Sequence, residues 1–340
     1  MLSKTVILGL ETSCDDTAAA VVANGRNILS NVVSSQDSLH HRFGGVVPEV
    51  ASRRHLEIIN PLIDEAMSKA GISLQEIDGI AVSYGPGLVG SLLVGVSIAK
   101  ALSYALDIPL IPVNHLEGHI YANFLTGSII TFPLVCLVVS GGHTSLLYVE
   151  GHGKIEVLGK TRDDAAGEVF DKIARALDLG FPGGPVIERH AQQGDSSVLS
   201  FPRALMGEDG KMDFSFSGVK TAVLNYIRME QEKGSRTDIY ALSAAFQDAV
   251  VEVLVDKSFM AARQKEAKQF LLAGGVAANG ELRRRLRVKL EAEGIEVVAP
   301  PVELCTDNGA MVAAAGYYYL RRGIRANWDL NAVPSLEVGQ

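Results

Sequence analysis

The feature that most constrains the fold of this chain is a strand–turn–strand pattern that occurs twice. Residues 5–10 and 18–23 are apolar runs on either side of a polar, acidic turn. Residues 133–140 and 145–149 are apolar runs on either side of a glycine turn. Two β-rich runs separated by a short turn predict a β-hairpin. Because 340 residues correspond to about two average domains, the two hairpins predict two related lobes.

The rest of the chain alternates between strand-like and helix-like runs, which indicates an α/β protein. Strands are expected at residues 77–83, 110–113 and 269–273. Helices are expected at residues 48–70, 90–106, 165–179, 218–232, 238–265, from about 280, and 308–321. Pro61 should kink or split the first of these helices, because proline removes a helix hydrogen bond.

Composition excludes several classes of protein. The chain is 47% hydrophobic with a net charge of −8, so it can bury a large core, unlike a disordered chain. The acidic balance argues against a protein that coats nucleic acid by charge alone. Cys14, Cys136 and Cys305 are too few and too far apart for a disulfide scaffold. The apolar run before Glu11 is too short for a signal peptide, and together these features predict a cytoplasmic protein.

Residues 80–99 form an uncharged stretch long enough to cross a bilayer as a helix. Gly85, Pro86 and Gly87 interrupt this stretch in its middle. Glycine and proline together are typical of a tight loop. We therefore expect a strand, a loop and a buried helix here instead of a membrane span.

Four glycine loops lie at the junctions of the expected elements, at residues 84–90, 140–144, 180–185 and 273–279. Glycine lets backbone N–H groups approach a phosphate, and a helix N-terminus favours an anion. A single loop of this kind is more often a plain turn, but four loops with two hairpins favour a nucleotide site. None of them matches the P-loop or the GxGxxG motif of a dinucleotide-binding unit.

A pair of histidines, His115 and His119, has the spacing of metal ligands on one helix face. Glu117 lies near the opposite face, unlike the glutamate of the HExxH protease motif, which directly follows the first histidine. Asp307 is the best candidate for a third ligand. It precedes an apolar helix, and the simpler interpretation from sequence alone is that Asp307 is the N-cap of that helix.

The turn of the first hairpin is acidic, with Asp15 and Asp16 at its tip and Glu11 nearby. Carboxylates in this position could hold a metal, orient a water or accept a proton, and the same residues also suit a plain turn. Ser13 does not lie in the GxSxG motif of a serine nucleophile. Nothing in the local sequence lowers the pKa of Cys14.

A series of motifs, in the same order along nearly the whole chain, resembles one known family. The motifs are GLETSCDDTAAAVV, HHRFGGVVPEVASRRH, GPGLVGSLLVG, HLEGHIYANF, VSGGHTSLL, AGEVFDKIARALDLGFPGGP, FSFSGVKTAV, LLAGGVAANGELR and CTDNGAMVAAAG. They resemble bacterial TsaD, the tRNA N6-adenosine threonylcarbamoyltransferase family. Two positions depart from the family's pattern, because SCDET reads SCDDT here and a common aspartate is Glu188, and both keep the charge.

The resemblance implies an α/β, actin-like ATPase fold of the sugar kinase, Hsp70 and actin type, with two duplicated lobes around a nucleotide cleft. By analogy, residues 1–108 and 307–340 would form lobe I and residues 109–306 lobe II. The implied reaction moves a threonylcarbamoyl group from threonylcarbamoyl-AMP to N6 of adenosine 37 in tRNAs reading codons that begin with adenine. AMP is released.

The resemblance also implies a set of site residues. His115, His119 and Asp307 would hold one divalent metal ion, iron first and zinc second, with Mg²⁺ as a further option beside the nucleotide. Asp15 and Asp16 would be catalytic, and Asp15 would orient or deprotonate the attacking amine. The adenylate would bind residues with backbone groups, hydroxyl acceptors or an amide to offer, namely Val138, Val139, Ser140, Gly141, Gly142, Asp171, Gly184, Glu188 and Asn279.

The implied partners are tRNA, a TsaB-like paralogue and a TsaE-like ATPase, with a TsaC-like enzyme supplying the adenylate. The basic residues Arg53 and Arg54 and the run 283–289 would contact tRNA. Three other functions compete with this one: a small-molecule kinase or ATPase, a glycoprotease, and a scaffold without activity. A kinase has no use for His115 and His119, the position of Glu117 argues against a protease, and a scaffold should lack the histidine pair.

Overall fold

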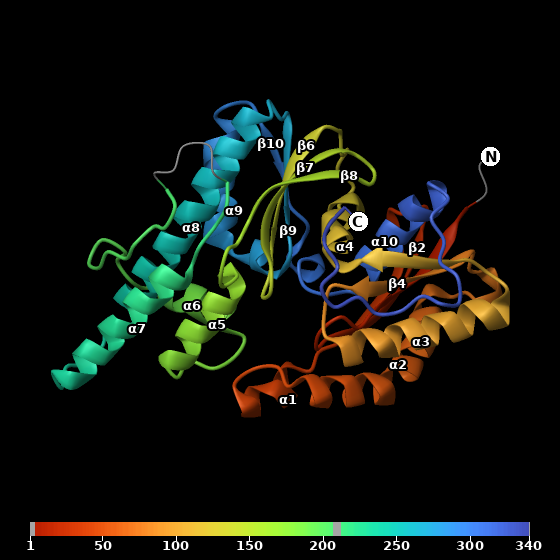
Figure 1. The fold of residues 1–340 in the computed structure, drawn as a ribbon, viewed down its shortest axis with the longest axis horizontal. Helices are drawn as coiled ribbons and strands as arrows, with labels where there is room; N and C mark the ends of the chain where they lie inside the picture. Colours follow the sequence, from red (N-terminus) through yellow and green to blue (C-terminus); the bar gives the residue numbers. More distant parts are fainter. Residues whose placement is uncertain (1–3, 207–211, 340) are drawn as a thin grey trace. The chain divides into compact units, whose positions relative to one another are not determined.

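The computed structural model describes residues 4–206 and 212–339, which form two compact units. The first unit comprises Met1–Ile130, His152–Lys154 and Pro300–Gln340, and the second comprises Thr131–Gly151 and Ile155–Ala299. Each unit is built on a five-stranded sheet with helices packed against it (Figure 1).

The sheet of the first unit has the strand order β3-β2-β1-β4-β5. Its strands are β1 (Val6–Glu11), β2 (Thr17–Ala23), β3 (Asn27–Ser34), β4 (Gly79–Gly85) and β5 (Leu110–Asn114). Strand β1 pairs antiparallel with β2, with Glu11 opposite Ala18, which confirms the first predicted hairpin. Strands β1, β4 and β5 are parallel. The acidic turn and the segments that follow β4 and β5 therefore share one edge of the sheet, where parallel sheets place their sites.

Helices cover both faces of this sheet. The long helices α2 (Pro48–Ala70) and α3 (Val89–Leu106) pack on the face to which Leu8 and Leu10 belong. Successive strand residues point to opposite faces, and Gly9 accordingly faces α10 (Gly309–Arg321) on the other side. Helix α10 also packs against the short helix α4 (His115–Ala122). The short helix α1 (Asp37–His40) follows β3.

The close approach of α10 to β1 depends on Gly9. A Cβ atom at this position would lie 2.3 Å from the Gly309 carbonyl oxygen and 2.5 Å from the Ala313 nitrogen. Because backbone atoms cannot move aside as a flexible side chain does, we expect Gly9→Ala to lower the free energy of unfolding by about 3 kcal/mol. Chemical denaturation measures this change. Gly218→Ala is the control, since its Cβ would meet nothing within 4 Å and alanine favours a helix over glycine; equal stability of the two variants would contradict the prediction.

Helix α2 runs through Pro61 without ending there. Of the two expected effects of Pro61, a kink or a split, the split is therefore wrong. Pro61 lies on the exposed side of the helix, where water can satisfy the carbonyl that loses its partner. Ile59, Leu62 and Ile63 are buried on the side that packs against the sheet, and they hold the helix together across the proline.

Helix α3 is the one described helix that is long and apolar enough to cross a membrane by length and composition. It packs against β4 and α2, with Leu92, Val96 and Ala99 buried. Together with β4, it confirms that residues 80–99 form a strand, a loop and a core helix.

The sheet of the second unit repeats the topology of the first. Its order is β10-β9-β6-β7-β8, with strands β6 (Leu134–Val139), β7 (Thr144–Gly151), β8 (Lys154–Lys160), β9 (Gln269–Ala273) and β10 (Glu296–Val298). Strand β6 is antiparallel to β7 and parallel to β9, as β1 is to β2 and β4. The second hairpin and the prediction of two related lobes are both confirmed.

The helices of the second unit are α5 (Ala166–Ala176), α6 (Gly183–Ala191), α7 (Ser217–Glu232), α8 (Ile239–Gln264) and α9 (Gly280–Glu291). All but α6 were expected from the apolar periodicity. Residues 180–185 were expected to form a loop, but the first turn of α6 begins within them, at Gly183. Glycine and proline are rare inside helices, so their presence predicted a loop. Both are tolerated in the first turn of a helix, which is where they lie in α6.

The lobe boundaries implied by the resemblance stay a prediction. Residues 109–130 and 300–306 belong to the first compact unit. Residues 110–122 lie there because β5 pairs with β4 and α4 packs on α10.

Candidate functional site

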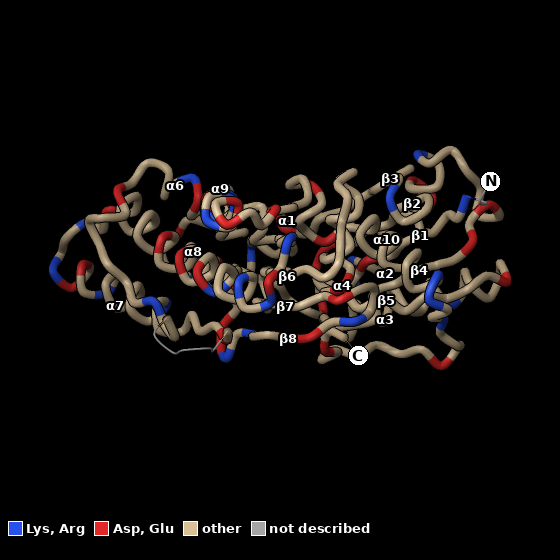
Figure 2. Tube along the Cα trace, turned by 90° about the horizontal axis from the view of Figure 1, so that it is seen from above, with Lys and Arg blue, Asp and Glu red and all other residues tan. Residues whose placement is uncertain are grey.

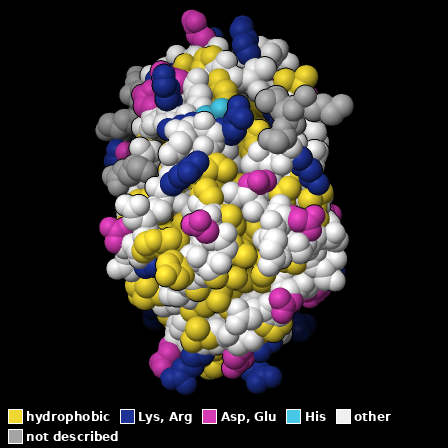
Figure 3. Space-filling view, turned by 90° about the vertical axis from the view of Figure 1, so that its right-hand side faces the viewer, with side chains coloured by type: hydrophobic (Ala, Val, Ile, Leu, Met, Phe, Trp, Pro, Cys, Tyr) yellow, Lys and Arg dark blue, Asp and Glu magenta, His cyan; other side chains and the backbone are white. Residues whose placement is uncertain are grey.

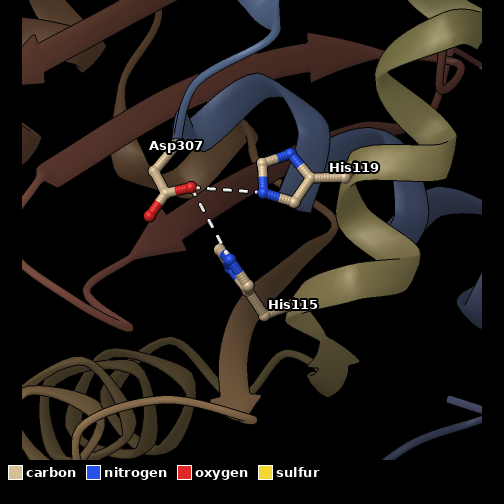
Figure 4. A group of neighbouring side chains, drawn as sticks. All are labelled: His115, His119 and Asp307. Carbon is tan, nitrogen blue, oxygen red and sulfur yellow. Dashed lines mark ion pairs between the residues drawn. The ribbon is translucent and has the colours of Figure 1, made fainter. Parts of the chain in front are cut away.

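The two histidines lie on α4, which begins directly after β5. Asn114 caps this helix, because its side-chain oxygen accepts hydrogen bonds from the N–H groups of Leu116 and Glu117. His115 and His119 are one turn apart and point the same way, toward Asp307 in the loop before α10 (Figure 4). The β5–α4 and loop–α10 junctions thus bring together residues almost 200 positions apart in sequence.

The three side chains form a compact group. His115 Nε2 lies 3.6 Å and His119 Nε2 lies 3.2 Å from Asp307 Oδ1. One ligand atom from each residue lies within 4.8 Å of the others. Neither ring nitrogen of His119 has a hydrogen-bond partner among the described residues, although both are buried. A buried imidazole that makes no hydrogen bond and has a carboxylate beside its Nε2 fits a metal ligand, and two imidazoles with one carboxylate are a donor set for a divalent transition metal.

Asp307 is not the N-cap of the last helix, so the simpler interpretation from the sequence is wrong. The N-cap is Asn308, whose side-chain oxygen accepts a hydrogen bond from the Met311 N–H. Either residue type can cap a helix, and only the backbone conformation decides between neighbours. Because Asn308 takes this role, Asp307 faces the histidine pair.

Glu11 is a second carboxylate at this centre, although from the sequence it was expected only as a carboxylate near the acidic turn. It is fully buried at the end of β1, and its Oε2 accepts hydrogen bonds from His115 Nδ1 at 2.9 Å and Ser83 Oγ at 2.5 Å. A carboxylate on Nδ1 orients a metal-binding histidine and leaves its Nε2 for the metal. A charged residue in an otherwise apolar strand was the sequence signal that Glu11 has a special role. The signal could not identify its partner, because His115 on α4 lies 104 positions away.

The charge state of His115 follows from its two carboxylate neighbours. Burial lowers the pKa of His115, but the negative charges of Glu11 and Asp307 outweigh burial and raise the pKa to about 9. In the metal-free chain His115 is therefore protonated near neutral pH, whereas a metal ligand must be the neutral imidazole.

We expect Zn²⁺ binding near neutral pH to release about one proton from His115. Affinity for Zn²⁺ should rise with pH and level off above the raised pKa of His115, since no proton is then left to displace. Calorimetric titration in two buffers with different ionisation enthalpies measures the protons released. Binding heats that do not depend on the buffer would contradict this expectation.

The acidic turn joins the two strands of the first hairpin, and a histidine on α2 holds it in place. His55, on α2, donates from Nε2 to the Cys14 carbonyl at 2.9 Å and accepts at Nδ1 from the Thr17 hydroxyl at 2.6 Å. It is fully buried, so it fixes both ends of the turn that carries Asp15 and Asp16.

Asp15 and Asp16 lie in an environment that opposes their negative charge. Burial raises the pKa of both, and repulsion from Asp307 adds to the effect, so that the pKa of Asp16 reaches about 8. Asp16 Oδ1 is buried without a hydrogen-bond partner among the described residues. Burial and the Asp15 charge raise the pKa of the Cys14 thiol well above its usual value, which agrees with Cys14 not being a nucleophile. Raised carboxylate pKa values in one place are typical of functional sites.

In the second unit, two of the four glycine loops, residues 140–144 and 273–279, meet at the ends of β6 and β9, and the start of α5 packs against the first of them. A Cβ at Gly274 would lie 2.4 Å from the Val139 carbonyl oxygen, and a Cβ at Gly167 would lie 2.6 Å from that of Ser140. Val138 and Val139 are buried in β6, whereas Gly141 and Gly142 are exposed in the turn that follows. Nothing lies within 4 Å of where their Cβ atoms would be. The turn therefore presents open backbone.

The other residues implied for the adenylate surround these loops. Asp171 Oδ1 accepts from the Gly183 N–H at 2.7 Å, one residue before Gly184, and Glu188 Oε1 accepts from the Gly280 N–H at 2.7 Å. Asn279 caps α9 through Oδ1 and donates from Nδ2 to Gln247 at 2.9 Å. A cavity of about 350 Å³ borders the glutamate and Gly280. Each of the two carboxylates thus binds an N–H group at a helix N-terminus, and the cavity borders the N-terminus of α9.

Around α8 and α9, basic residues are mixed with acidic ones along the chain (Figure 2). Arg285 pairs with Asp248 and Glu281, and Lys289 pairs with Asp256. On the face in Figure 3, charged side chains are scattered around a hydrophobic middle. Arg53 and Arg54 pair with Glu49 and Glu57 of their own helix in exposed contacts, which stabilise little.

The fold is shared with solved structures of low sequence identity. HypF from T. kodakarensis superimposes with a TM-score of 0.63 at 17% identity, over 96% of this chain and 49% of that one. Component A of the Acidaminococcus fermentans (R)-2-hydroxyglutaryl-CoA dehydratase gives a TM-score of 0.54 at 14% identity, over 92% and 98% of the two chains. The repeated sheet and these neighbours define an actin-like ATPase fold.

The amino-acid sequence identifies the family within this fold. The family model TsaD, tRNA N6-adenosine threonylcarbamoyltransferase, matches residues 27–314. A protein of that name from Symbiobacterium thermophilum is 58% identical over 99% of this chain and 98% of its own length. One from Clostridium perfringens is 52% identical over the full length of both. The chain belongs to the TsaD family of tRNA N6-adenosine threonylcarbamoyltransferases, and is thus an enzyme with a tRNA substrate.

Proposed function

We propose that this chain transfers the threonylcarbamoyl group of threonylcarbamoyl-AMP to N6 of adenosine 37 in tRNAs that read codons beginning with adenine. The observation that carries this proposal is the His115, His119 and Asp307 group at the sheet edge that also carries the acidic turn, in a chain of the TsaD family. This edge combines a metal-binding group with carboxylates of raised pKa. A kinase or ATPase with Mg²⁺ alone would have no use for the histidines.

His115, His119 and Asp307 would hold one divalent metal ion, which we assign as iron, with zinc as the alternative. A metal bound by these residues would supply Lewis acidity toward a carbonyl or phosphate oxygen. Glu11 holds the His115 ring in the orientation that turns Nε2 toward Asp307. Mg²⁺ would accompany the nucleotide.

Asp15 and Asp16 would act on the attacking amine. The exocyclic amine of adenine is a poor nucleophile, so removal of its proton as the bond forms lowers the barrier. In the proposed step the N6 nitrogen attacks the carbonyl carbon of the mixed anhydride. The C–O bond to AMP breaks, AMP leaves as the phosphate anion, and Asp15 takes the proton from N6. Asp16, with its unpartnered Oδ1, would accept a hydrogen bond beside it.

The second unit would bind the adenylate. Backbone groups of Val138, Val139, Ser140, Gly141 and Gly142 would face its phosphate. Asp171 and Glu188 would accept from the ribose hydroxyls, Gly184 would allow close approach of the α6 N-terminus, and Asn279 would lie at the base. The open backbone of the turn and the cavity beside Glu188 support this assignment.

We further propose that the chain works in the cytoplasm with a TsaB-like paralogue and a TsaE-like ATPase, on adenylate made by a TsaC-like enzyme. The net charge of −8 supports shared binding of tRNA, because this chain lacks the positive balance that phosphate contacts require. Lobe I would be residues 1–108 with 307–340, and lobe II residues 109–306.

The experiment that tests the function is a transfer assay with radiolabelled threonine, the partner proteins and an unmodified tRNA that reads an ANN codon. We expect label in tRNA adenosine only when this chain is present. If the partners are active with another family member and this chain still transfers no label, the proposed function is wrong.

A further inference from the structure

The residue between the two histidines, Glu117, has an unusual place for a charged side chain. It is only 3% exposed. Two positions from each histidine, it lies on the opposite side of α4 from the metal-binding group. Both oxygens of its carboxylate nevertheless accept a hydrogen bond: Oε2 accepts from the Tyr319 hydroxyl at 2.5 Å and Oε1 accepts from the Gly339 N–H at 3.2 Å.

These two hydrogen bonds join α4 to the elements that surround it. Tyr319 is on α10, the helix that begins two residues after Asp307. The proposed metal ligands come from two separate elements, α4 and the start of α10. The bond from Glu117 to Tyr319 connects the same two elements on the far side from the ligands. Between these points, the Met311 side chain of α10 packs against Gly118.

The Gly339 bond belongs to a strap formed by residues 333–339. Val333 N–H donates to the Tyr84 carbonyl at 2.8 Å, and the Pro334 carbonyl accepts from the Gly87 N–H at 3.1 Å. The Glu337 carbonyl accepts from Asn114 Nδ2 at 2.9 Å.

The strap is hydrogen-bonded to two side chains at the start of α4, those of Asn114 and Glu117. Asn114 caps the helix with its oxygen while its nitrogen holds the strap. Glu117 binds the strap with one carboxylate oxygen and α10 with the other. These contacts leave α4 little freedom to rotate or slide against α10.

We infer that Glu117 and Tyr319 are positioning residues that set the spacing between the histidine pair and Asp307, with the strap 333–339 holding α4 from the other end. The inference rests on the proposed metal site. Hydrogen-bonded groups outside the ligand set typically change metal affinity by about 10- to 100-fold. A buried carboxylate held by a hydroxyl and an amide is the kind of rigid support that such a site requires.

The test uses the full chain and two matched single-atom deletions on one helix. Tyr319→Phe removes the hydroxyl that binds Glu117. Tyr318→Phe removes the neighbouring hydroxyl, which accepts a hydrogen bond from Arg26 instead. We expect Tyr319→Phe to weaken Zn²⁺ binding, measured by competition with a chelating dye, by about tenfold. Tyr318→Phe should stay within about twofold of the unmodified chain. The visible spectrum of bound Co²⁺, which reports ligand geometry, should change only in Tyr319→Phe.

A double-variant cycle shows whether both residues act through one bond. Glu117→Gln keeps the shape of the side chain but weakens its acceptors. If the bond is shared, Glu117→Gln with Tyr319→Phe should lose no more Zn²⁺ affinity than the weaker-binding single variant. Additive losses would overturn the inference. The inference would also be overturned if Tyr319→Phe lowered the melting temperature but left the Zn²⁺ affinity and the Co²⁺ spectrum unchanged.

Removal of residues 333–340 is the second, independent variant. We expect the shortened chain to bind Zn²⁺ about tenfold more weakly while its second unit remains folded. Unchanged affinity would exclude a role for the strap. If the unmodified chain itself binds no Zn²⁺ or Co²⁺, the metal site fails together with the inference; if it binds both and the variants match it, only the inference fails.

Discussion

Replacement of both histidines, His115→Ala with His119→Ala, should reduce threonylcarbamoyl transfer to tRNA by about 10³-fold. Two of the three proposed ligands are then gone, and a metal centre typically contributes several kcal/mol to a transition state. A loss of about 4 kcal/mol corresponds to about 10³ in rate. The rate is measured as incorporation of labelled threonine under single-turnover conditions.

A chelator serves as the control for the histidine variant. The unmodified chain should lose activity when the metal is removed and regain it when Fe²⁺ or Zn²⁺ is added back. The double variant should respond to neither treatment. A folded double variant that transfers at the normal rate would show that the histidines do not serve this reaction.

Replacement of the proposed base, Asp15→Ala, should reduce turnover by about 10²- to 10⁴-fold, the usual contribution of a general base. Binding of threonylcarbamoyl-AMP should change far less, because Asp15 is proposed to act on the amine of the other substrate. Burial raises the pKa of Asp15. The base acts when deprotonated, so the rate of the unmodified chain should rise with pH through this raised pKa, and the variant should lose that rise.

Asp37→Asn is the matched control for this prediction. Asp37 is an exposed carboxylate whose negative charge contributes to the raised pKa of Asp15. Its replacement should leave turnover nearly unchanged and move the pH profile slightly to lower pH. Equal losses of turnover and of adenylate affinity in Asp15→Ala would show that Asp15 serves binding instead.

Local sequence patterns determined most of the secondary structure. Residues 269–273 form the expected strand, and the expected helices at 48–70 and 90–106 lie within one residue of α2 and α3. Hydrophobic periodicity records which side of an element is buried, so it reports both type and extent. Helix α6 was missed because the glycine and proline residues at its start are also the signal for a loop.

The motifs of the sequence also determined the family, and the family implies a list of expected site residues. What they did not determine is how neighbours divide their roles. Asp307 and Asn308 suit a helix cap equally well by residue type, yet Asn308 caps α10 and Asp307 faces the histidines.

Only the tertiary structure decided which residues support the site. Glu11 lies beside His115 because β1, β4 and β5 are adjacent, and Glu117 meets Tyr319 because α10 packs on α4. The positions in these two contacts are separated by 104 and 202 residues. The local sequence pattern predicts the type and the buried side of one helix or strand, but it does not predict which distant element packs against that side. For this reason the sequence pointed to the proposed ligands, and the fold revealed what holds them in place.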